Sequence, residues 1–553
     1  MSEETFDFVV VGAGSAGCVV ANRLSEDGRH SVLLLEYGGT DRSLYVRMPA
    51  ALSIPMNMKR FDWGYVGEPE PGLGGRVLRV PRGKGLGGSS SINGLVYVRG
   101  HALDFDRWEE EGARGWAYRD VLPYFRRAET RREGADYYRG GEGPLSTRAG
   151  DVRNPLYAAF MEAGRQAGYA VSDDLNGFRQ EGLGRLDMTV RDGVRCSASL
   201  AYLAPAAGRR NLSVVTHSRA EKVLFEGRRA VGVRHSRGGT SHVANARREV
   251  VLCAGAINSP QLLMLSGVGP ASDLRALGID VVGDLPGVGA NLQDHLEFYF
   301  QVESKSPITL YSKTGLLGRG LVGAQWLLNR SGDGATNQFE AGGFIRSRAG
   351  VRFPDIQFHF LPLAVSYDGK KLAEGHGFQA HVGPMRSKSR GRVGLRSADP
   401  AAAPNIFFDY MSHPDDWAEM RACVRLTREI FAQKAFDPHR GREIAPGAGV
   451  TDDEAIDDFV RRRAESAYHA SCTCKMGGDG DPMAVVDPQG RVRGLDALRV
   501  VDASIMPSIT NGNLNAPTIM IGEKLADSIL GRPPPPPSNA PFHVAPDWET
   551  RQR

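Results

Sequence analysis

The feature that most constrains the fold is a glycine-rich turn close to the N-terminus. Residues 6–17 read FDFVVVGAGSAG, an apolar β-rich run that stops at Gly12 and is followed by a helix-like run over residues 15–25. Gly12 allows a tight turn, Gly14 lets the backbone approach a pyrophosphate, and Gly17 lets the helix pack against the strand. Strand, turn and helix in this order predict the start of a nucleotide-binding βαβ unit.

The next strand strengthens this prediction. Residues 30–39, HSVLLLEYGG, form a second apolar run, and Glu36 stands at its end, where an acidic side chain can accept a hydrogen bond from a ribose hydroxyl. Ser15 opens the helix, whose first N–H groups and positive dipole end favour a phosphate. The motif predicts a dinucleotide but leaves FAD and NAD both open.

Strands of similar quality recur far along the chain, which bears on the domain organisation. They read NLSVVTHS, RRAVGVRHS, REVVLCAG and LRVVDAS, at residues 211–218, 228–236, 248–255 and 498–504. Because the first three lie in the middle of the chain and the last lies near its end, one nucleotide-binding domain built from separated segments explains them better than several independent domains. We therefore expect an α/β fold (α+β overall) with a Rossmann-like, largely parallel sheet.

The region between these segments has a different pattern. Four runs in residues 309–460 alternate like antiparallel strands and precede a helical run at 415–433. We expect residues 1–308 and 461–532 to form the nucleotide-binding domain and residues 309–460 to form a substrate-binding domain with a largely antiparallel sheet. Residues 155–200 are left open between the two. The end, 533–553, is proline-rich and predicts an extended tail.

Composition excludes several classes of protein. The 68 basic and 64 acidic residues give a net charge of +4, which does not indicate a nucleic-acid-binding protein. Six scattered cysteines are not a disulfide framework, acidic residues precede the first apolar run where a signal peptide carries basic ones, and no apolar run is long enough to span a membrane. We expect a cytoplasmic protein, and leave open a peripheral contact with the inner face of the cell membrane.

A second glycine cluster points to the kind of ligand. Residues 81–100 read PRGKGLGGSSSINGLVYVRG and contain five closely spaced glycines, Gly88 and Gly94 among them, before an apolar strand. A mobile loop rarely runs straight into such a strand, so the glycines indicate backbone pressed against a flat ligand. An isoalloxazine ring is such a ligand.

These residues, taken with four further segments, carry a resemblance to a known family. GAGSAG with Glu36, the 81–100 segment, GAINSPQLLMLSGVGP, LPGVGANLQDH, AYHASCTCKMG and VVDASIMPSITNGNLNAPTIMIGEKLAD are similar to the glucose–methanol–choline (GMC) oxidoreductases. The likeness covers about residues 5–530. It implies an FAD enzyme that oxidises an alcohol, and DDLNGFRQEGLG, FEAGGFIRSR and YMSHPDDW resemble its choline-oxidising members.

The resemblance assigns two catalytic residues and a set of cofactor contacts. It implies that His469 is the base and that Asn513 occupies the second active-site position; a histidine suits proton abstraction near neutral pH, and an amide can stabilise a developing alkoxide. Ile92 stands where some choline oxidases attach the flavin through histidine, so FAD is expected to be non-covalent. The remaining cofactor contacts that it implies are Asn93, Gly94, Val96, Val223, Asp502, Asn515 and Pro517.

Choline carries a fixed positive charge, so its pocket needs a carboxylate or aromatic faces. The resemblance implies that Glu340 lies near this cation, and Phe339 and Tyr468 are candidates for aromatic contacts. A metal site is not expected, because His469, Cys472 and Cys474 lack a fourth ligand at suitable spacing.

Several alternatives stay open at this point. They are a dehydrogenase for a neutral aliphatic or polyether alcohol, a flavoprotein electron carrier without alcohol chemistry, and an NAD enzyme. For choline, the product is betaine aldehyde, and further oxidation to glycine betaine is left open. The electron acceptor is either oxygen or the respiratory chain, and the oligomeric state is open, a homo-oligomer included.

Overall fold

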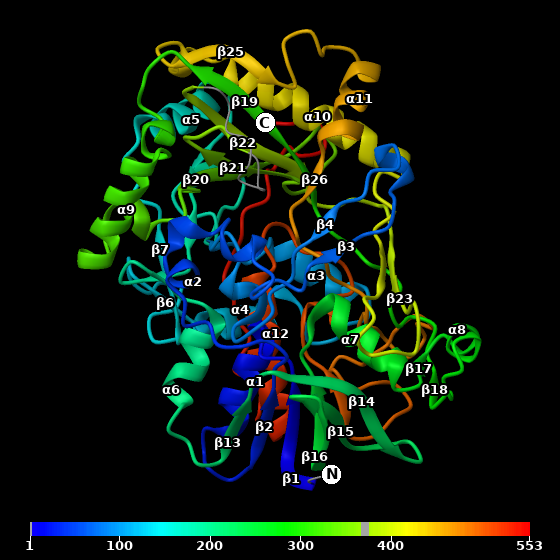
Figure 1. The fold of residues 1–553 in the computed structure, drawn as a ribbon. Helices are drawn as coiled ribbons and strands as arrows, with labels where there is room; N and C mark the ends of the chain where they lie inside the picture. Colours follow the sequence, from blue (N-terminus) through cyan, green and yellow to red (C-terminus); the bar gives the residue numbers. More distant parts are fainter. Residues whose placement is uncertain (1–2, 366–374) are drawn as a thin grey trace.

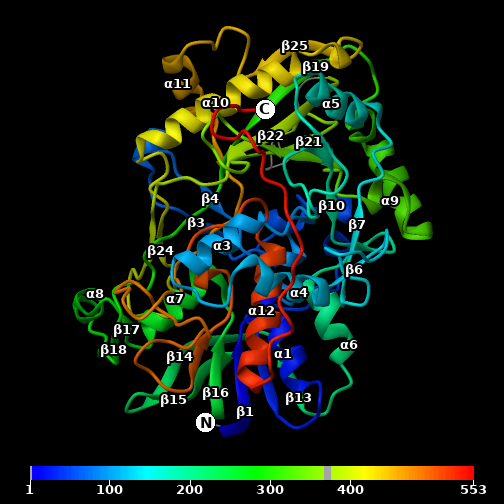
Figure 2. The same ribbon diagram turned by 180° about the vertical axis from the view of Figure 1, so that it is seen from behind.

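The computed structural model describes residues 3–365 and 375–553, and two separate sheets organise it. A seven-stranded sheet lies at the end of the molecule that holds the N-terminus, and a six-stranded antiparallel sheet lies at the opposite end (Figure 1). Helices α3 (Ala102–Glu110) and α4 (Tyr118–Ala128) lie between them, as the view from behind also shows (Figure 2). The predicted α/β class, with one mainly parallel and one antiparallel sheet, is confirmed.

The seven-stranded sheet is assembled from distant parts of the chain. Its parallel part consists of strands β13 (Leu212–Val215), β2 (Val32–Leu35), β1 (Glu3–Val11), β16 (Thr240–Leu252) and β27 (Leu498–Val500). Strands β14 (Ser218–Glu226) and β15 (Arg229–Arg237) extend it as an antiparallel hairpin beside β16. The separated strands that the sequence analysis grouped together thus pair in one sheet.

The register of this sheet aligns the strand ends. Val11 pairs with Leu35 on one side and with Leu252 on the other, and Leu252 pairs in turn with Val500. Because these strands are parallel, the turns that follow them all leave the sheet at the same edge. Glu36, Gly12 and Asp502 belong to those turns.

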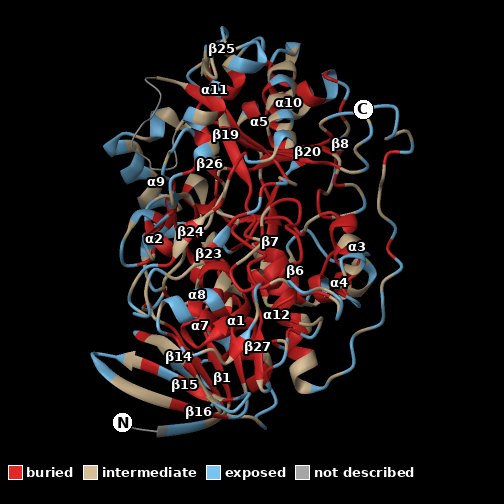
Figure 3. Cartoon of the chain, turned by 90° about the vertical axis from the view of Figure 1, so that its right-hand side faces the viewer, coloured by how far each residue is buried: buried red, intermediate tan, exposed pale blue. Residues whose placement is uncertain are grey.

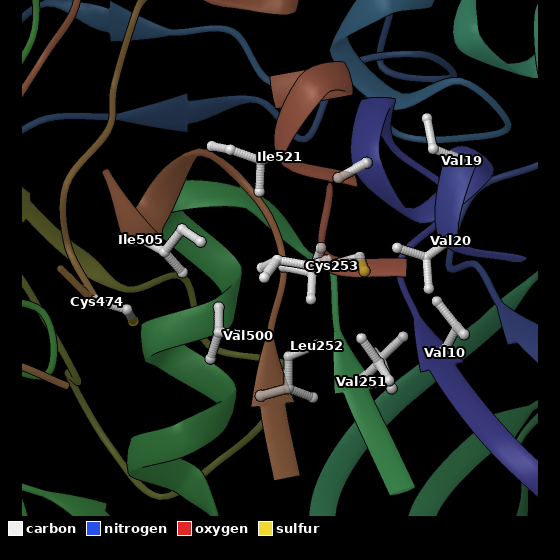
Figure 4. Packing of buried hydrophobic residues seen from close by; sticks show 14 of the residues in the cluster. Val10, Val19, Val20, Val251, Leu252, Cys253, Cys474, Val500, Ile505 and Ile521 are labelled. Carbon is white, nitrogen blue, oxygen red and sulfur yellow. The ribbon is translucent and has the colours of Figure 1, made fainter. Parts of the chain in front are cut away.

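Two helices from opposite ends of the chain cover this sheet. Helix α1 (Ser15–Ser25) packs against α12 (Asn515–Leu530), and both lie over β1, β16 and β27. In Figure 4, Val20 of α1 lies toward Val10 of β1, whereas Val19 contacts α12, where a Cβ on Gly522 would lie 3.0 Å from Val19 Cβ. On the same edge, α7 (Gly255–Leu265) begins after two residues, Cys253 and Ala254, that follow the end of β16.

The six-stranded sheet forms a second core. Its order is β20 (Ala341–Ile345), β21 (Ile356–Leu361), β22 (Gly377–Pro384), β19 (Leu296–Ser304) and β25 (Arg440–Ala445), with β26 (Glu465–Ser466) also paired to β19. Helices α5 (Pro155–Gln166), α10 (Pro414–Phe431) and α11 (Asp453–Arg463) pack on it (Figure 1). Burial is continuous along its central strands (Figure 3).

Sheet membership differs from the expected domain boundaries in two places. Strand β19 lies in the range 1–308 assigned to the nucleotide-binding domain, and β26 lies in the range 461–532, yet both belong to the antiparallel sheet. Strand β23 (Arg392–Gly394), inside 309–460, pairs only with β24 (Asn405–Phe407), away from that sheet. Alternating apolar residues predict a strand but not its partner. The division into domains stays a prediction.

The proline-rich tail runs back over the molecule. Ser538 N–H donates to the carbonyl of Arg119 in α4, and His543 N–H donates to the carbonyl of Phe178. Farther on, Trp548 accepts from Gly350, and the terminal Arg553 pairs with Glu429 of α10. The tail therefore connects α12 beside the parallel sheet with the helix on the antiparallel sheet. Among the described residues no helix is both long and apolar enough to cross a bilayer.

Candidate functional site

A cavity of about 470 Å³ lies between the aligned strand ends and the antiparallel sheet. It extends from Glu36 and the N-terminus of α1 to His469 and Asn513. The predicted site residues that line it are Gly12, Gly14, Ser15, Glu36, Gly88, Asn93, Gly94, Val96, Phe339, Tyr468, His469, Asp502, Asn513 and Asn515. Gly17, Val223, Glu340 and Pro517 do not line it.

At the Glu36 end of the cavity, the glycines of the two glycine-rich loops leave no room for side chains. Gly12 has a φ of +98°, and a Cβ there would lie 2.7 Å from the carbonyl oxygen of Cys253. A Cβ on Gly17 would lie 1.8 Å from the carbonyl oxygen of Gly12, which explains why Gly17 lies behind the cavity wall: it permits the close contact of α1 with the turn. A Cβ on Gly88 would approach Gly14 Cα to 2.7 Å, so the two predicted glycine loops touch each other.

Helix α1 presents its N-terminus to this end of the cavity. Its N-cap is Gly14, which supplies no side-chain hydrogen bond to the first-turn N–H groups. Ser15 Oγ donates to Asn515 Oδ1 at 2.8 Å and joins the start of α1 to the start of α12. An uncapped helix N-terminus beside a glycine turn suits a diphosphate, so the residues present fit the phosphates of FAD.

Glu36 ties three loops together around the same region. Its Oε2 accepts from Ala13 N–H at 3.0 Å, and its Oε1 accepts from Gly38 at 2.7 Å and from Gly85 at 3.0 Å. Burial raises the pKa of the Glu36 carboxyl despite these donors. Since each carboxylate oxygen can accept two hydrogen bonds, Oε2 keeps capacity for a ribose hydroxyl.

Val223, one of the expected cofactor contacts, does not line the cavity. Val223 is fully buried in β14, and its N–H donates to Ser266 Oγ at 2.8 Å. The residues of β14 that reach the cavity are Ser218, Arg219 and Ala220. Near them Tyr37 stacks on Trp63, and Arg219 lies over the Tyr37 ring at 4.4 Å and donates to its hydroxyl. The strand that holds Val223 thus borders the cavity, but three of its other residues line it.

Asp502 and Pro517 take supporting positions. Asp502 Oδ2 accepts from Gly255 N–H at 2.9 Å and from Ser259 Oγ at 2.6 Å, which fixes the start of α7 at the cavity edge. Pro517 is buried in the first turn of α12, where its missing N–H would have no intrahelical partner.

The loop over residues 88–96 is held from behind by a buried arginine that the sequence analysis missed. Arg195 Nη1 donates to the carbonyl and the side-chain oxygen of Asn93, both at 2.8 Å, and Nε donates to the carbonyl of Val46. Burial without a neighbouring carboxylate lowers the pKa of Arg195 to about 9. Arg195 thus fixes Asn93 and Gly94 against the cavity.

His469 and Asn513 meet at the opposite end. His469 Nε2 lies 3.1 Å from Asn513 Nδ2, and the backbone N–H of His469 donates to Asp294 Oδ1 at 2.6 Å. Burial, together with the neighbouring His295, His359 and Arg82, lowers the pKa of His469 well below the usual histidine value. The imidazole is therefore neutral near pH 7.

A chain of hydrogen bonds assigns the tautomer of His469. His295 Nε2 lies 3.1 Å from the carbonyl oxygen of Met385, which can only accept, so His295 carries its proton there. Burial lowers the pKa of His295 to about 3, so this ring is neutral and its Nδ1 accepts. His469 Nδ1, 2.9 Å away, must then donate, and the lone pair of His469 is on Nε2. That atom accepts from Asn513 in the cavity.

Two further polar side chains complete this group. Asn513 Oδ1 lies 3.3 Å from both Gln357 Nε2 and His359 Nε2, side chains of β21 that no sequence motif singled out. His359 lines the cavity. Gln357, His359 and His469 together hold the Asn513 amide with its Nδ2 toward His469.

The predicted cation-binding residue, Glu340, points elsewhere. Its Oε1 accepts from Thr336 Oγ1 and its Oε2 accepts from Val152 N–H, each at 2.6 Å. These contacts anchor the 150–152 loop to the start of β20. Phe339, one residue earlier, does line the cavity because neighbouring residues of an extended chain face opposite ways.

A different carboxylate, Glu297, lies where Glu340 was expected. Glu297 is buried at the start of β19, lines the cavity together with Phe339, Tyr468 and His469, and has its Oε1 3.2 Å from His381 Nδ1. The Phe339 ring contacts the His359 and His381 rings edge to face. In LEFYF the acid alternates with apolar residues, a pattern typical of a solvent-facing position, so the sequence carries no signal of its burial.

The cysteines next to His469 form no metal centre in the part of the chain that is described. Within residues 3–365 and 375–553, no three histidine, cysteine or acidic side chains cluster closely enough to hold a metal ion. Cys472 and Cys474 are buried, and burial raises the pKa of the Cys472 thiol to about 12.

Comparisons with known proteins agree with this geometry. The GMC oxidoreductase family models match residues 6–297 and 387–522. The chain is 59% identical over 547 residues to a protein of Brucella ovis named oxygen-dependent choline dehydrogenase, covering 99% of this chain and all of that one. An FAD-dependent oxidoreductase of Chaetomium thermophilum superposes with a TM-score of 0.86 at 27% identity, over 95% of this chain and 99% of that one. Pyridoxine 4-oxidase of Mesorbium loti gives 0.85 at 31%, with the same coverage.

The glycine contacts predict the effect of one added methyl group. Gly17→Ala places a Cβ against the Gly12 carbonyl and should displace the phosphate-binding turn, so the purified variant should carry little flavin. The ratio of absorbance near 450 nm to that at 280 nm measures this. Gly208→Ala is the matched control, because nothing lies within 4 Å of its Cβ position. Equal flavin content in Gly17→Ala and the parent would contradict the assignment of this turn.

Proposed function

This chain belongs to the GMC oxidoreductase family, and from that premise we propose that it oxidises choline to betaine aldehyde. FAD is its cofactor and an alcohol is oxidised, as in the family. The observation that carries choline over a neutral alcohol is the buried carboxylate of Glu297, which shares a cavity with His469 and Asn513. The name of the Brucella ovis relative supports the same substrate.

The cation of choline is proposed to bind at Glu297. A carboxylate in a buried cavity interacts strongly with a positive charge, and a trimethylammonium group cannot donate a hydrogen bond, so it needs charge and aromatic faces rather than acceptors. Phe339 and Tyr468 border the same part of the cavity. Their rings supply such faces while they exclude water.

The hydroxyl is proposed to bind between His469 and Asn513. Its O–H donates to Nε2 of His469, and its oxygen accepts from Nδ2 of Asn513, which replaces the hydrogen bond of 3.1 Å between these two groups. His469 Nε2 takes the proton, and the Asn513 amide stabilises the developing alkoxide. FAD, when bound, supplies the hydride acceptor. Gly12, Gly14, Glu36 and the 88–96 loop are proposed to hold it without a covalent bond.

The function is tested by anaerobic mixing with choline. The flavin absorbance should bleach with choline; bleaching by a neutral alcohol and not by choline would refute the substrate. Turnover is measured in parallel with oxygen and with an artificial electron acceptor, and the comparison identifies the natural acceptor. The name of the Brucella ovis relative favours oxygen. The number of acceptor equivalents reduced per choline, one or two, tells whether the aldehyde is oxidised further to glycine betaine.

The location of the protein is also a proposal. All six cysteines are buried and unpaired, which suits a reducing compartment such as the cytoplasm.

Glu297→Gln should separate choline from a neutral alcohol. Removing one charge of a buried pair costs about 2–5 kcal/mol, so kcat/KM for choline should fall by about 10²-fold. For the carbon analogue of choline, in which a tert-butyl group replaces trimethylammonium, the kcat/KM of the variant should fall much less. Steady-state kinetics with both alcohols measure the difference.

Glu340→Gln is the matched control, because Glu340 is an equally buried carboxylate that does not line the cavity. Its kcat/KM ratio between the two alcohols should stay at the parent value. If this ratio changes with Glu340→Gln and not with Glu297→Gln, the cation site is at Glu340 after all.

His295 is proposed to act as a positioning residue for the base. His295→Leu removes the acceptor that fixes the proton on His469 Nδ1, so kcat should fall by about 10²-fold, the low end of what a positioned base contributes, with little change in KM. His295→Gln, whose side-chain oxygen can accept from Nδ1, should recover part of the rate. Flavin content and rapid-reaction flavin reduction provide the readouts, and a loss of kcat that Gln does not relieve would contradict the tautomer assignment.

A further inference from the structure

The buried guanidinium of Arg195 has only neutral partners. Its Nε donates to the carbonyl of Val46 at 2.8 Å. Its Nη1 donates to the carbonyl of Ser90 at 3.2 Å and to both oxygens of Asn93 at 2.8 Å. Nη2 is buried and has no hydrogen-bond partner among the residues that the structure describes. No carboxylate in the described part of the chain forms an ion pair with this side chain.

A buried charge of this kind is unfavourable, because the guanidinium has left water without gaining a counter-ion. The four oxygens that accept from Arg195 replace part of its hydration but do not neutralise it. Two of the residues that supply them, Ser90 and Asn93, line the cavity. The unbalanced positive charge therefore lies directly behind the cavity wall.

The contact with Arg195 also fixes the direction of the Asn93 amide. Asn93 Oδ1 accepts from Arg195 Nη1 at 2.8 Å and from the backbone N–H of Leu95 at 3.1 Å. Because both of these groups can only donate, the side-chain oxygen and nitrogen of Asn93 cannot be exchanged. Asn93 Nδ2 donates to no other described residue, and Asn93 lines the cavity. Asn93 therefore presents an N–H donor to the cavity.

The same loop contains a strained residue that these contacts hold in place. Leu95 has a φ of +60°, in the left-handed region that a leucine rarely adopts. The hydrogen bond from its N–H to Asn93 Oδ1 closes a turn around Gly94, and Asn337 Nδ2 donates to the carbonyl of Gly94 at 2.8 Å. Arg195 completes this set of contacts from behind, so the loop keeps one geometry at the cavity wall.

Gly94 leaves space for a ring on the cavity side of the loop. The only described atom within 4 Å of a Cβ built on Gly94 is Cε2 of Phe339, at 3.9 Å, and both residues line the cavity. Contacts within the chain thus explain the glycines at Gly12 and Gly17 but not the one at Gly94. A flat ring placed on this loop uses the free space and brings its rim to Asn93 Nδ2. The rim of a flavin ring carries carbonyl oxygens and nitrogens that accept hydrogen bonds.

We propose that Arg195 is a positioning residue for the flavin ring: it directs the Asn93 N–H to the rim of the ring and raises the flavin reduction potential through its unbalanced charge. This rests on the proposed placement of FAD along the 88–96 loop. A hydride brings two electrons and one proton to the ring, so an uncharged ring gains one negative charge on reduction. A nearby cation and a polarised donor stabilise that charge more than they stabilise the oxidised ring.

The diphosphate of FAD fits the charge of Arg195 less well than the ring does. The diphosphate is proposed to bind at the start of α1, where Gly14 touches Gly88. Arg195 instead contacts Asn93, which lies five residues farther along the loop and beside the space at Gly94. The negative charge that balances Arg195 therefore arises only when the ring is reduced.

The proposal is tested by equilibrium redox titration of the purified holoenzyme against a dye of known potential. Arg195→Met removes the charge and should lower the midpoint potential by about 30 mV or more, which is a tenfold change in the equilibrium constant of a two-electron reduction. Arg195→Lys keeps the charge and should recover part of the potential. Asn93→Asp replaces the donor with a carboxylate of the same shape and should lower the potential as well.

Arg346→Met is the matched control, because Arg346 is an equally buried arginine that pairs with Glu181 and does not line the cavity. Its midpoint potential should equal that of the parent. Flavin content and the dissociation constant of FAD from the apoprotein report folding and cofactor binding. Choline-dependent bleaching is measured separately, so a failure of the proposed function is distinguished from a failure of this inference.

Two results would overturn the role of Arg195. One is a parent-like potential in both Arg195→Met and Asn93→Asp. The other is weaker FAD binding by Arg195→Met at the parent potential, which would assign the charge to the diphosphate. If Arg195→Met retains no flavin, the potential of Asn93→Asp decides: a lowered value supports the inference and a parent-like value refutes it.

Discussion

The site depends on the parallel pairing of β1, β2, β16 and β27. These strands lie as much as several hundred residues apart in the chain, but their register brings Val11, Leu35, Leu252 and Val500 to one level of the sheet. Parallel strands must release their following turns at the same edge. The glycine turn, Glu36, the start of α7 and Asp502 are together for that reason alone, and the cavity exists because the antiparallel sheet faces this edge.

Sequence patterns predicted those parts of the site that are local. A turn that binds a phosphate and a ribose needs particular residues at fixed places within a short segment. A motif can therefore identify them, as it does for Gly12, Gly14, Gly17 and Glu36. In the structure Gly12, Gly14 and Glu36 line one cavity, and the loops at Gly14 and Gly88 touch.

Whether a predicted residue lines the cavity depends on side-chain direction and on strand pairing. Val223 and Glu340 lie in elements that border the cavity, but a shift of one or three residues along a strand turns a side chain to the other face. Glu297 was overlooked because an acid within an apolar strand looks like a surface position until its burial is known. The protonated nitrogen of His295 is assigned from its contact with the Met385 carbonyl, which is 90 residues away in the chain.

Two neighbouring side chains at the His469 end of the cavity, the imidazole of His469 and the carboxyl group of Glu297, have different chemical roles. Near His469, the low polarity of the surroundings and neighbouring imidazoles keep the base neutral, so that it can receive a proton. Nearby Glu297 supplies a negative charge to the same cavity, with His381 as its hydrogen-bond partner. A neutral base and a fixed carboxylate suit a substrate that arrives with a permanent positive charge and loses a proton from its neutral end.

The tail described above also sets how the two sheets can move. It leaves α12 beside the parallel sheet, is held at Arg119, Phe178 and Gly350, and ends at Glu429 on the far side of the cavity. A proline-rich chain in the extended polyproline II conformation already spans about 3.1 Å per residue, so it can lengthen little further. Any widening between the sheets must therefore detach the tail from one of its attachment points. Residues 538–553 thus link the two halves of the fold from outside, through contacts that none of the sheet strands makes.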